Sequence, residues 1–225
     1  MKTFTALALL GIAGSVNAGS VDLPVQVGGA FSIPVTSMKE SRFSATVRQQ
    51  YDFSCGSAAL STLLTYQYLH SVTEQAIFEE MYLHGDQKKI RREGFSLLDM
   101  KRYLAAHGFQ ADGFEAPLER LESANIPAIV LLNENGYNHF VVVKGLRDGR
   151  VLIGDPANGT RAIARASFDA MWRNHILFVI VNHEKLARFN VAADWHAAPA
   201  APVSTGIVRE GLSGITMPKL GPSDF

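Results

Sequence analysis

Two hydrophobic patterns follow one another along the chain, and their order restricts the fold more than any other feature. Up to about residue 108, apolar residues recur at helical spacing, as at Leu60, Leu63 and Leu64, which predicts amphipathic helices. Farther along, they form short apolar runs that are typical of strands, namely residues 126–132, 139–143, 150–153 and 176–181. Helices followed by strands predict an α+β fold, with N-terminal helices packed on a C-terminal antiparallel sheet.

Three helices are expected in the first of these regions. One begins near Cys55, and a second is opened by Ser71 and Glu74, whose spacing resembles a capping box. A third opens at Ser96 and ends before Gly108, where a glycine suits the end of a helix. A short fourth helix, over residues 167–172, precedes the last strand.

The first 18 residues have the features of a signal peptide. Lys2 supplies a positive charge, an apolar run extends to about Gly14, and small residues precede a cleavage site after Ala18. No later run reaches the roughly 20 apolar residues of a membrane-spanning helix. We therefore expect an exported protein, located in the periplasm of a Gram-negative cell, with no integral membrane segment after cleavage.

Composition separates three further parts of the chain. Residues 19–47 form an N-terminal extended segment, in which 21–34 predict a short hairpin or an extended lead-in. Residues 48–183 are long enough for one folded domain, and residues 184–225 form an Ala/Pro/Gly-rich tail. Lys and Arg together number 21, equal to Asp and Glu, so no net charge favours binding to nucleic acid.

The chain has one cysteine, Cys55, in the stretch RQQYDFSCGSAALSTLL. Exported proteins usually pair their cysteines in disulfides, so a lone cysteine is an intermolecular crosslink, an inert buried residue or a reactive thiol. The start of a helix favours a thiolate, because unpaired backbone N–H groups attract negative charge there. We therefore expect this position to lower the pKa of Cys55, and Gly56 to leave the thiol accessible.

A predicted hairpin places a histidine beside a carboxylate. If residues 147–149 form a three-residue loop, Leu146 pairs with Arg150. His139 and Asp155 are then diagonal neighbours on one face of the sheet, as a base and the group that orients it would be. A two-residue loop would place the two side chains on opposite faces.

Four separated elements resemble the bacteriocin-processing peptidases, which are papain-like cysteine proteases that remove leader peptides after a double glycine. These elements are Gln49 six residues before Cys55, the helix that follows, His139 with its apolar run, and Asp155 sixteen residues later. The resemblance covers about residues 48–181, and it implies the papain-like cysteine peptidase fold.

The resemblance also implies a role for each of these residues. Cys55 matches the nucleophile, His139 the general base, and Asp155 the residue that orients the imidazole. Gln49 matches the side-chain donor of the oxyanion hole. Many members of the family have an aspartate immediately before the cysteine, where this chain has Ser54.

A stand-alone exported domain of this kind is similar to the peptidase-like proteins of bacterial functional amyloid systems. The resemblance implies a periplasmic cysteine peptidase that cleaves a secreted protein or a component of its export machinery, such as the amyloid subunits or their outer-membrane secretion partner. No metal or organic cofactor is expected, because Cys-His-Asp chemistry needs only water. Two alternatives stay open: a non-proteolytic peptide-binding or quality-control module of the same fold, and an acyl transferase that uses the same thioester.

Overall fold

The structure is a computed structural model that describes residues 20–25, 29–34 and 37–199. The predicted signal peptide and residues 200–225 of the predicted tail lie outside the described residues. The chain divides into two units, residues 1–41 and 42–225, and each is described by itself.

The first unit contains an antiparallel hairpin. Strand β1 (Ser20–Val25) pairs with β2 (Gly29–Pro34) along its whole length. A hairpin rather than an extended lead-in therefore forms over the residues that the alternating pattern predicted. Helix α1 (Met38–Arg42) follows, and Ser37 Oγ caps it by accepting a hydrogen bond from Glu40 N at 3.1 Å.

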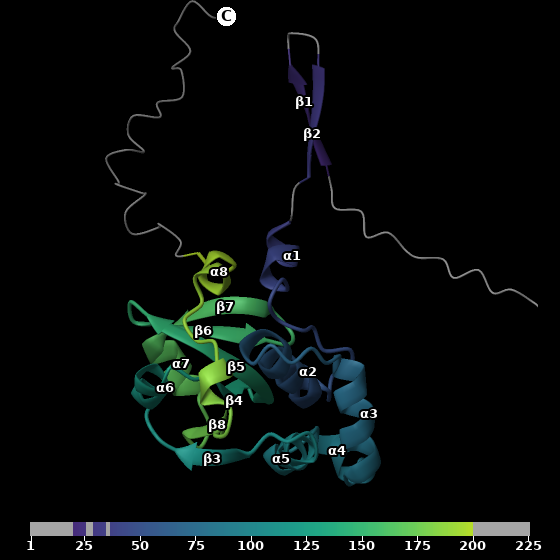
Figure 1. Cartoon of the computed structure of the whole chain (residues 1–225), viewed down its shortest axis with the longest axis vertical. Helices are drawn as coiled ribbons and strands as arrows, with labels where there is room; N and C mark the ends of the chain where they lie inside the picture. The colour runs from purple at the N-terminus through teal and green to yellow at the C-terminus, as the bar shows by residue number, and fades with distance from the viewer. Residues whose placement is uncertain (1–19, 26–28, 35–36, 200–225) are drawn as a thin grey trace, which may run out of the picture. The chain divides into compact units, whose positions relative to one another are not determined.

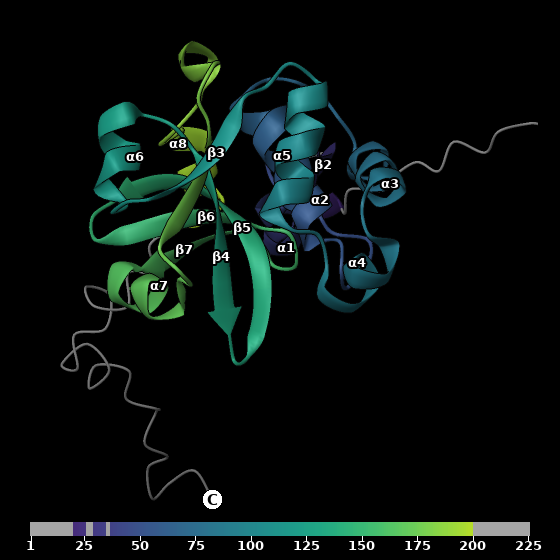
Figure 2. The same cartoon turned by 90° about the horizontal axis from the view of Figure 1, so that it is seen from below.

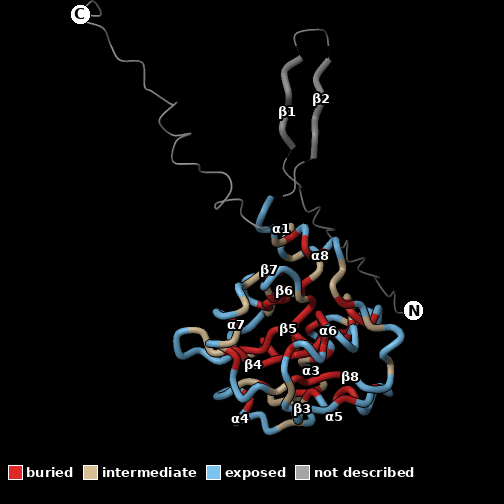
Figure 3. The backbone as a smooth tube through the Cα atoms, turned by 90° about the vertical axis from the view of Figure 1, so that its left-hand side faces the viewer, coloured by how far each residue is buried: buried red, intermediate tan, exposed pale blue. Residues whose placement is uncertain are grey.

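A six-stranded antiparallel sheet forms the centre of the second unit, in the order β3-β8-β4-β5-β6-β7 (Figure 1). The strands are β3 (Ala111–Glu115), β4 (Ala128–Glu134), β5 (Tyr137–Arg147), β6 (Arg150–Asp155), β7 (Gly159–Ala164) and β8 (Ile176–Ile180). The strands between the two edges are buried along most of their length, whereas the edge strand β3 is mostly exposed (Figure 3).

Helices cover both faces of this sheet (Figure 2). On one side lie α2 (Cys55–Thr62) with its π-helical continuation (Leu63–Gln67), α3 (Glu74–His84), α4 (Gln87–Glu93) and α5 (Leu97–Ala106). On the other side lie α6 (Glu119–Ala124) and α7 (Arg165–Met171). The described chain ends with a 3₁₀ turn (Glu184–Leu186) and α8 (Ala192–His196). The predicted α+β class is confirmed. None of the helices described here has the length and apolar character needed to cross a membrane.

The alternation of side chains along the strands produces two cores. In β5, Val142 joins the cluster beneath α2, α3 and α5, while Val141 and Val143 join the cluster beneath α6 and α7. Since neighbouring residues of a strand point to opposite faces, the run of valines supplies both cores at once. This two-sided burial explains why β4, β5 and β8 read as continuous apolar runs.

The helix caps agree with the sequence prediction in one case and differ in another. Ser96 and Asp99 form a complete capping box at the start of α5. The capping box predicted at Ser71 is wrong, because α3 begins at Glu74 and its cap is Thr73, whose Oγ1 accepts from Ala76 N at 3.2 Å. The Glu74 carboxylate does not turn back onto its own helix; it contacts the loop before α2.

The hairpin between β5 and β6 has a two-residue turn and a β-bulge. Arg147 pairs with Arg150, so the predicted three-residue loop is wrong; Asp148 and Gly149 both have positive φ, as a tight hairpin turn requires. Between Val143 and Gly145 the register shifts by one residue, which restores the predicted pairing beyond the bulge. Val142 pairs with Gly154, so His139 and Asp155 share a face after all.

Segments on both sides of the predicted domain belong to the second unit. Before it, the side chain of Thr46 is buried and its Oγ1 lies 2.7 Å from Thr160 Oγ1. After it, Phe189 and Trp195 are buried, and Asn190 N donates to the Lys144 carbonyl at 2.8 Å. The structured domain is therefore longer at both ends than residues 48–183.

Candidate active site

His139 and Asp155 lie next to each other at one end of the sheet. His139 is in β5 and Asp155 ends β6, and the imidazole Nε2 is 3.5 Å from Asp155 Oδ2. Their side chains are 4% and 0% exposed. The structure thus brings together the predicted base and the predicted orienting group. Because Nε2 faces the carboxylate, Nδ1 is the nitrogen left to exchange a proton with a nucleophile.

Both oxygens of the Asp155 carboxylate accept hydrogen bonds. Its Oδ1 accepts from the backbone N–H groups of Ala157 at 2.8 Å and Asn158 at 3.2 Å. Its Oδ2 accepts from Asn158 Nδ2 and from Arg161 Nε, each at 3.0 Å. Burial alone would raise the pKa of Asp155, but its contacts with His139, Asn158 and Arg161 outweigh burial and hold the pKa well below its usual range. The carboxylate is therefore ionised at neutral pH and suited to stabilise an imidazolium.

Sequence reasoning missed two charged residues of this site. Arg161, in β7, has its Nη2 2.8 Å from Glu134 Oε1 and 2.9 Å from Asp155 Oδ2. Glu134, at the end of β4, has its other oxygen 4.0 Å from His139 Nε2. One nitrogen and one oxygen from each of the two carboxylates lie within 4.8 Å of one another, close enough to hold a cation. The Arg161 guanidinium already supplies the positive charge between the carboxylates.

Cys55 is the first residue of α2, and only 6% of it is exposed. Burial raises the pKa of the thiol, while hydrogen bonds from the backbone N–H groups of Phe140 and Gly56 act in the opposite direction. The prediction that the helix start lowers the pKa of Cys55 is therefore wrong. The backbone N–H groups do lower this pKa, but desolvation raises it by more. The contact with Phe140, the residue after His139, places the thiol beside the strand that carries the predicted base.

Gly56 is explained by packing rather than by access to the thiol. A Cβ at this position would lie 3.0 Å from Phe95 Cβ and 3.0 Å from Met100 Cε. A glycine therefore lets α2 approach α5 and the loop before it, which fixes the helix that carries Cys55.

Gln49 lies beside the site, in the loop before α2. Its backbone N–H donates to the carbonyl of Pro156, the residue after Asp155, at 3.1 Å. Its side-chain Nε2 donates to the Tyr51 carbonyl at 3.2 Å. This bond uses one of the two N–H donors of the amide nitrogen, so the role of Gln49 as an oxyanion donor stays a prediction.

Tyr137 links His139 to the same loop. Its ring stacks on the imidazole of His139, with the ring centroids 5.8 Å apart, and its hydroxyl donates to the Asp52 carbonyl at 2.7 Å. Burial raises the pKa of Tyr137, and the nearby Cys55 adds to this rise. Tyr137 therefore covers one face of the imidazole and ties the β4–β5 hairpin to the loop before α2.

A buried glutamate, Glu74, holds Ser54, the residue before Cys55. Ser54 Oγ donates to Glu74 Oε1 at 2.5 Å, and the same oxygen accepts from Ser57 Oγ at 3.3 Å and from Gln50 N at 3.3 Å. Glu74 is 4% exposed, and its Oε2 is buried without a hydrogen-bond partner in the described part of the chain. Ser54 thus joins the start of α2 to the start of α3.

Comparison with known proteins gives this arrangement a family. The sequence profile of the peptidase C39 family matches residues 44–184, a segment that includes Gln49, Cys55, His139 and Asp155. The chain belongs to the peptidase C39 family. As a C39 cysteine peptidase, it is a hydrolase that acts on peptide bonds.

Individual proteins agree with this assignment. "Probable functional amyloid protease FapD" of Pseudomonas aeruginosa is 39% identical over 182 residues, which are 80% of this chain and 80% of that protein. The peptidase domain of Streptococcus ComA, a bifunctional ABC transporter of a quorum-sensing pathway, aligns with a TM-score of 0.51 and 19% identity over 61% of this chain and 97% of its own. A double glycine motif protease from an AMS/PCAT transporter, solved with its leader peptide, aligns with a TM-score of 0.50 and 26% identity over 60% and 89%. The C39 fold of the chain is thus confirmed.

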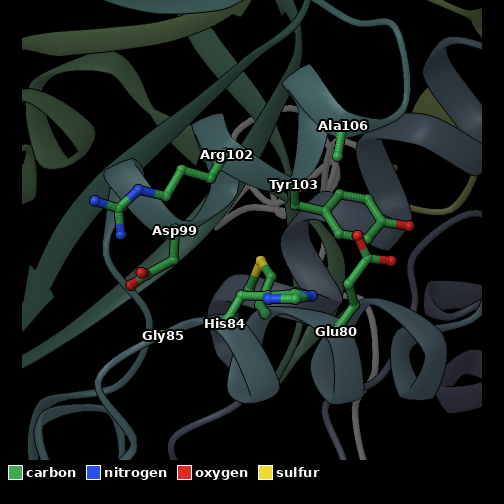
Figure 4. A pocket seen from close by; sticks show the side chains of 8 residues that line it. Glu80, His84, Gly85, Asp99, Arg102, Tyr103 and Ala106 are labelled. Carbon is green, nitrogen blue, oxygen red and sulfur yellow. The ribbon is translucent and has the colours of Figure 1, made fainter.

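The C39 peptidase also has a cavity away from these residues, between α3 and α5 (Figure 4). It has a volume of about 240 Å³ and is lined by Glu80, His84, Asp99, Arg102 and Tyr103, among others. The acidic groups are already engaged, since Glu80 lies 3.5 Å from His107 Nε2 and Asp99 accepts from Ser96. No residue of the Cys55 site lines this cavity.

Proposed function

We propose that this C39 peptidase is exported to the periplasm and acts in functional amyloid formation, where it cleaves a secreted protein or a component of its export machinery. Two observations support this proposal. The chain is similar to a probable functional amyloid protease over 80% of its length, and residues 1–18 have the pattern of a cleaved signal peptide. The substrate is then an amyloid subunit or its outer-membrane secretion partner.

The 3.5 Å contact between His139 and Asp155, beside the start of α2, is the observation that carries the mechanism. Since burial raises the pKa of the Cys55 thiol, the buried site needs a base to take its proton. His139 accepts that proton at Nδ1, and Asp155 stabilises the imidazolium through Nε2. The thiolate then attacks the carbonyl carbon of the scissile peptide bond.

Charge moves to the carbonyl oxygen in this step. The backbone N–H of Cys55 and the side-chain amide of Gln49 are the donors for this oxyanion, and one such donor typically contributes about 3 kcal/mol to transition-state stabilisation. The imidazolium of His139 returns its proton to the leaving amine, which frees the first product. Water, deprotonated by His139, hydrolyses the thioester and restores the Cys55 thiol.

Mass spectrometry of secreted proteins tests the proposed activity. Cells that produce wild-type protein and cells that produce Cys55→Ala are compared, with His84→Ala as a control outside the site. We expect one peptide bond of an amyloid component to be cleaved in wild-type and control cells and to stay intact with Cys55→Ala. Equal cleavage in all three would overturn the proposal. Products joined to an amine, instead of free carboxylates, would identify an acyl transferase.

Export is tested separately. We expect the mature protein in the periplasmic fraction, and N-terminal sequencing should begin at Gly19, directly after Ala18. A protein that keeps Met1 and stays in the cytosolic fraction would overturn the proposed location and leave the peptidase assignment intact.

A further inference from the structure

Two carboxylates face the same nitrogen of the catalytic imidazole. Asp155 Oδ2 lies 3.5 Å and Glu134 Oε2 lies 4.0 Å from His139 Nε2. The Glu134 side chain is 29% exposed, whereas Asp155 is fully buried. The imidazolium that forms during catalysis would therefore have two negative charges near its Nε2.

A single guanidinium holds these carboxylates together. Arg161 Nη2 contacts Glu134 Oε1 at 2.8 Å and Asp155 Oδ2 at 2.9 Å, and Arg161 Nε donates to Asp155 Oδ2 at 3.0 Å. A guanidinium with donors in a rigid plane fixes two acceptors in direction as well as distance. Arg161 thus contributes to the position of both carboxylates relative to His139, together with the contacts that Asp155 makes with Ala157 and Asn158.

The sheet order brings these groups to one place. Glu134, His139, Asp155 and Arg161 belong to β4, β5, β6 and β7, which are successive neighbours in the sheet. Glu134 pairs with Tyr137 at the β4–β5 turn, two residues before the histidine. The arrangement therefore follows from the strand register and does not depend on a loop.

We propose that Glu134 and Arg161 are positioning residues of the peptidase reaction. Arg161 holds Asp155 and Glu134 against His139 Nε2, and Glu134 adds a second negative charge that stabilises the imidazolium. This inference rests on the proposed roles of Cys55, His139 and Asp155, and it assigns functions to two residues outside that set.

The charged groups around His139 predict the direction in which each substitution changes the titration of the site. The ionisable groups around His139 are Cys55 from α2, Tyr137 from the same strand, and Glu134, Asp155 and Arg161 from the neighbouring strands. Removing a negative charge makes an imidazolium easier to deprotonate, and removing a positive charge makes it harder. Loss of Glu134 and loss of Arg161 should therefore change the titration of the site in opposite directions.

Alkylation of Cys55 by iodoacetamide measures this titration without a peptide substrate. The rate is followed against pH in wild type, His139→Ala, Glu134→Gln and Arg161→Gln. The step in the wild-type pH profile that is absent from the His139→Ala profile is assigned to the imidazolium of His139. We expect Glu134→Gln to move this step to lower pH by about half a unit, and Arg161→Gln to move it to higher pH by a similar amount.

Matched variants separate charge from structure. Glu119→Gln and Arg165→Gln break an ion pair of 2.6 Å elsewhere in the domain, and they should leave the step unchanged. Arg161→Lys keeps the charge, and we expect its step to lie closer to wild type than that of Arg161→Gln. Circular dichroism confirms that each variant is folded.

Shifts in the same direction, or no shift in folded Glu134→Gln and Arg161→Gln, would overturn the inference and leave the proposed function intact. If wild type itself shows no step that depends on His139, the proposed Cys55–His139 pair fails, and this inference fails with it. The two failures are thus distinguished by the wild-type curve alone.

Discussion

The ammonium group of Lys144 lies 2.9 Å from Asp194 Oδ2, and this pair joins the bulge of β5 to helix α8. Lys144 is fully buried, and it also donates to the Ala45 carbonyl at 2.8 Å. Asn190 completes the connection, because its Oδ1 accepts from Leu146 N at 2.8 Å. The bulge sets the register between His139 and Asp155. A segment beyond the C39 match, which ends at residue 184, therefore supports the strand that carries His139.

Asp194→Asn should destabilise the protein strongly. The substitution removes the charge that faces the buried Lys144, and an unpaired buried charge typically costs about 3 kcal/mol or more in the free energy of unfolding. Urea unfolding followed by circular dichroism measures the loss. Asp169→Asn is the matched control, because it breaks an exposed pair with Arg165 and should change the unfolding free energy by less than about 1 kcal/mol.

The double variant Lys144→Met with Asp194→Leu tests whether the cost comes from the unpaired charge. Replacing both partners by apolar residues leaves no buried charge, and such replacements are often neutral. We expect the double variant to regain most of the stability that Asp194→Asn loses. A double variant as unstable as the single one would show that packing at this site, rather than charge, determines stability.

Ser54→Ala should weaken the start of α2. Glu74 Oε1 loses its short hydrogen bond from Ser54 Oγ and keeps two contacts of 3.3 Å, so we expect a loss of about 1–2 kcal/mol. Ser57→Ala removes one of the longer contacts and is the matched control, with a smaller expected loss. The thermal midpoints of the two variants make the comparison, and a larger effect of Ser57→Ala would contradict it.

The relation between His139 and Asp155 shows which features of the site can be predicted from the sequence and which cannot. The sequence predicts their shared face from a three-residue loop, yet the turn has two residues and the bulge at Lys144 restores the predicted register. The Asp148-Gly149 dipeptide is typical of a two-residue hairpin turn, so this turn can be predicted from the neighbouring residues alone. The bulge is fixed by Asn190 and Asp194, more than forty positions away, so no pattern within the hairpin reveals it.

The sequence does not predict Arg161 or the contact of Glu74 with Ser54 for a similar reason. Strand β7 is a half-exposed edge strand without a clear apolar alternation, and a sequence pattern does not identify Arg161 as a neighbour of Asp155. The sequence pattern indicates that Glu74 belongs to a local capping box, but its carboxylate contacts Ser54, just before another helix. The direction of the pKa shift of Cys55 depends on its burial by the whole fold. Only the contribution of the helix start can be inferred from the neighbouring residues.

Acid should remove part of the stability that Asp155 provides. Its pKa lies below the usual range in the folded protein, while an unfolded aspartate titrates near about 3.9. The contribution is therefore present above about pH 4 and is lost as the pH falls toward the folded pKa. We expect the difference in unfolding free energy between wild type and Asp155→Asn, roughly 2 kcal/mol at neutral pH, to shrink on acidification. Asp148→Asn, in an exposed turn, is the control, and a difference that stays constant with pH would contradict the prediction.

Gln49→Ala should slow peptide hydrolysis without changing the reactivity of the thiol. The variant removes the side-chain donor for the oxyanion, and loss of one such donor lowers kcat by about 10²- to 10³-fold. Alkylation of Cys55 forms no oxyanion, so its rate should stay near that of wild type. Both rates are measured on the same preparation, with the substrate identified from secreted proteins and with Gln50→Ala as an exposed neighbouring control. If alkylation slowed as much as hydrolysis, Gln49 would act on the loop before α2 and on the position of Cys55 instead of on the oxyanion.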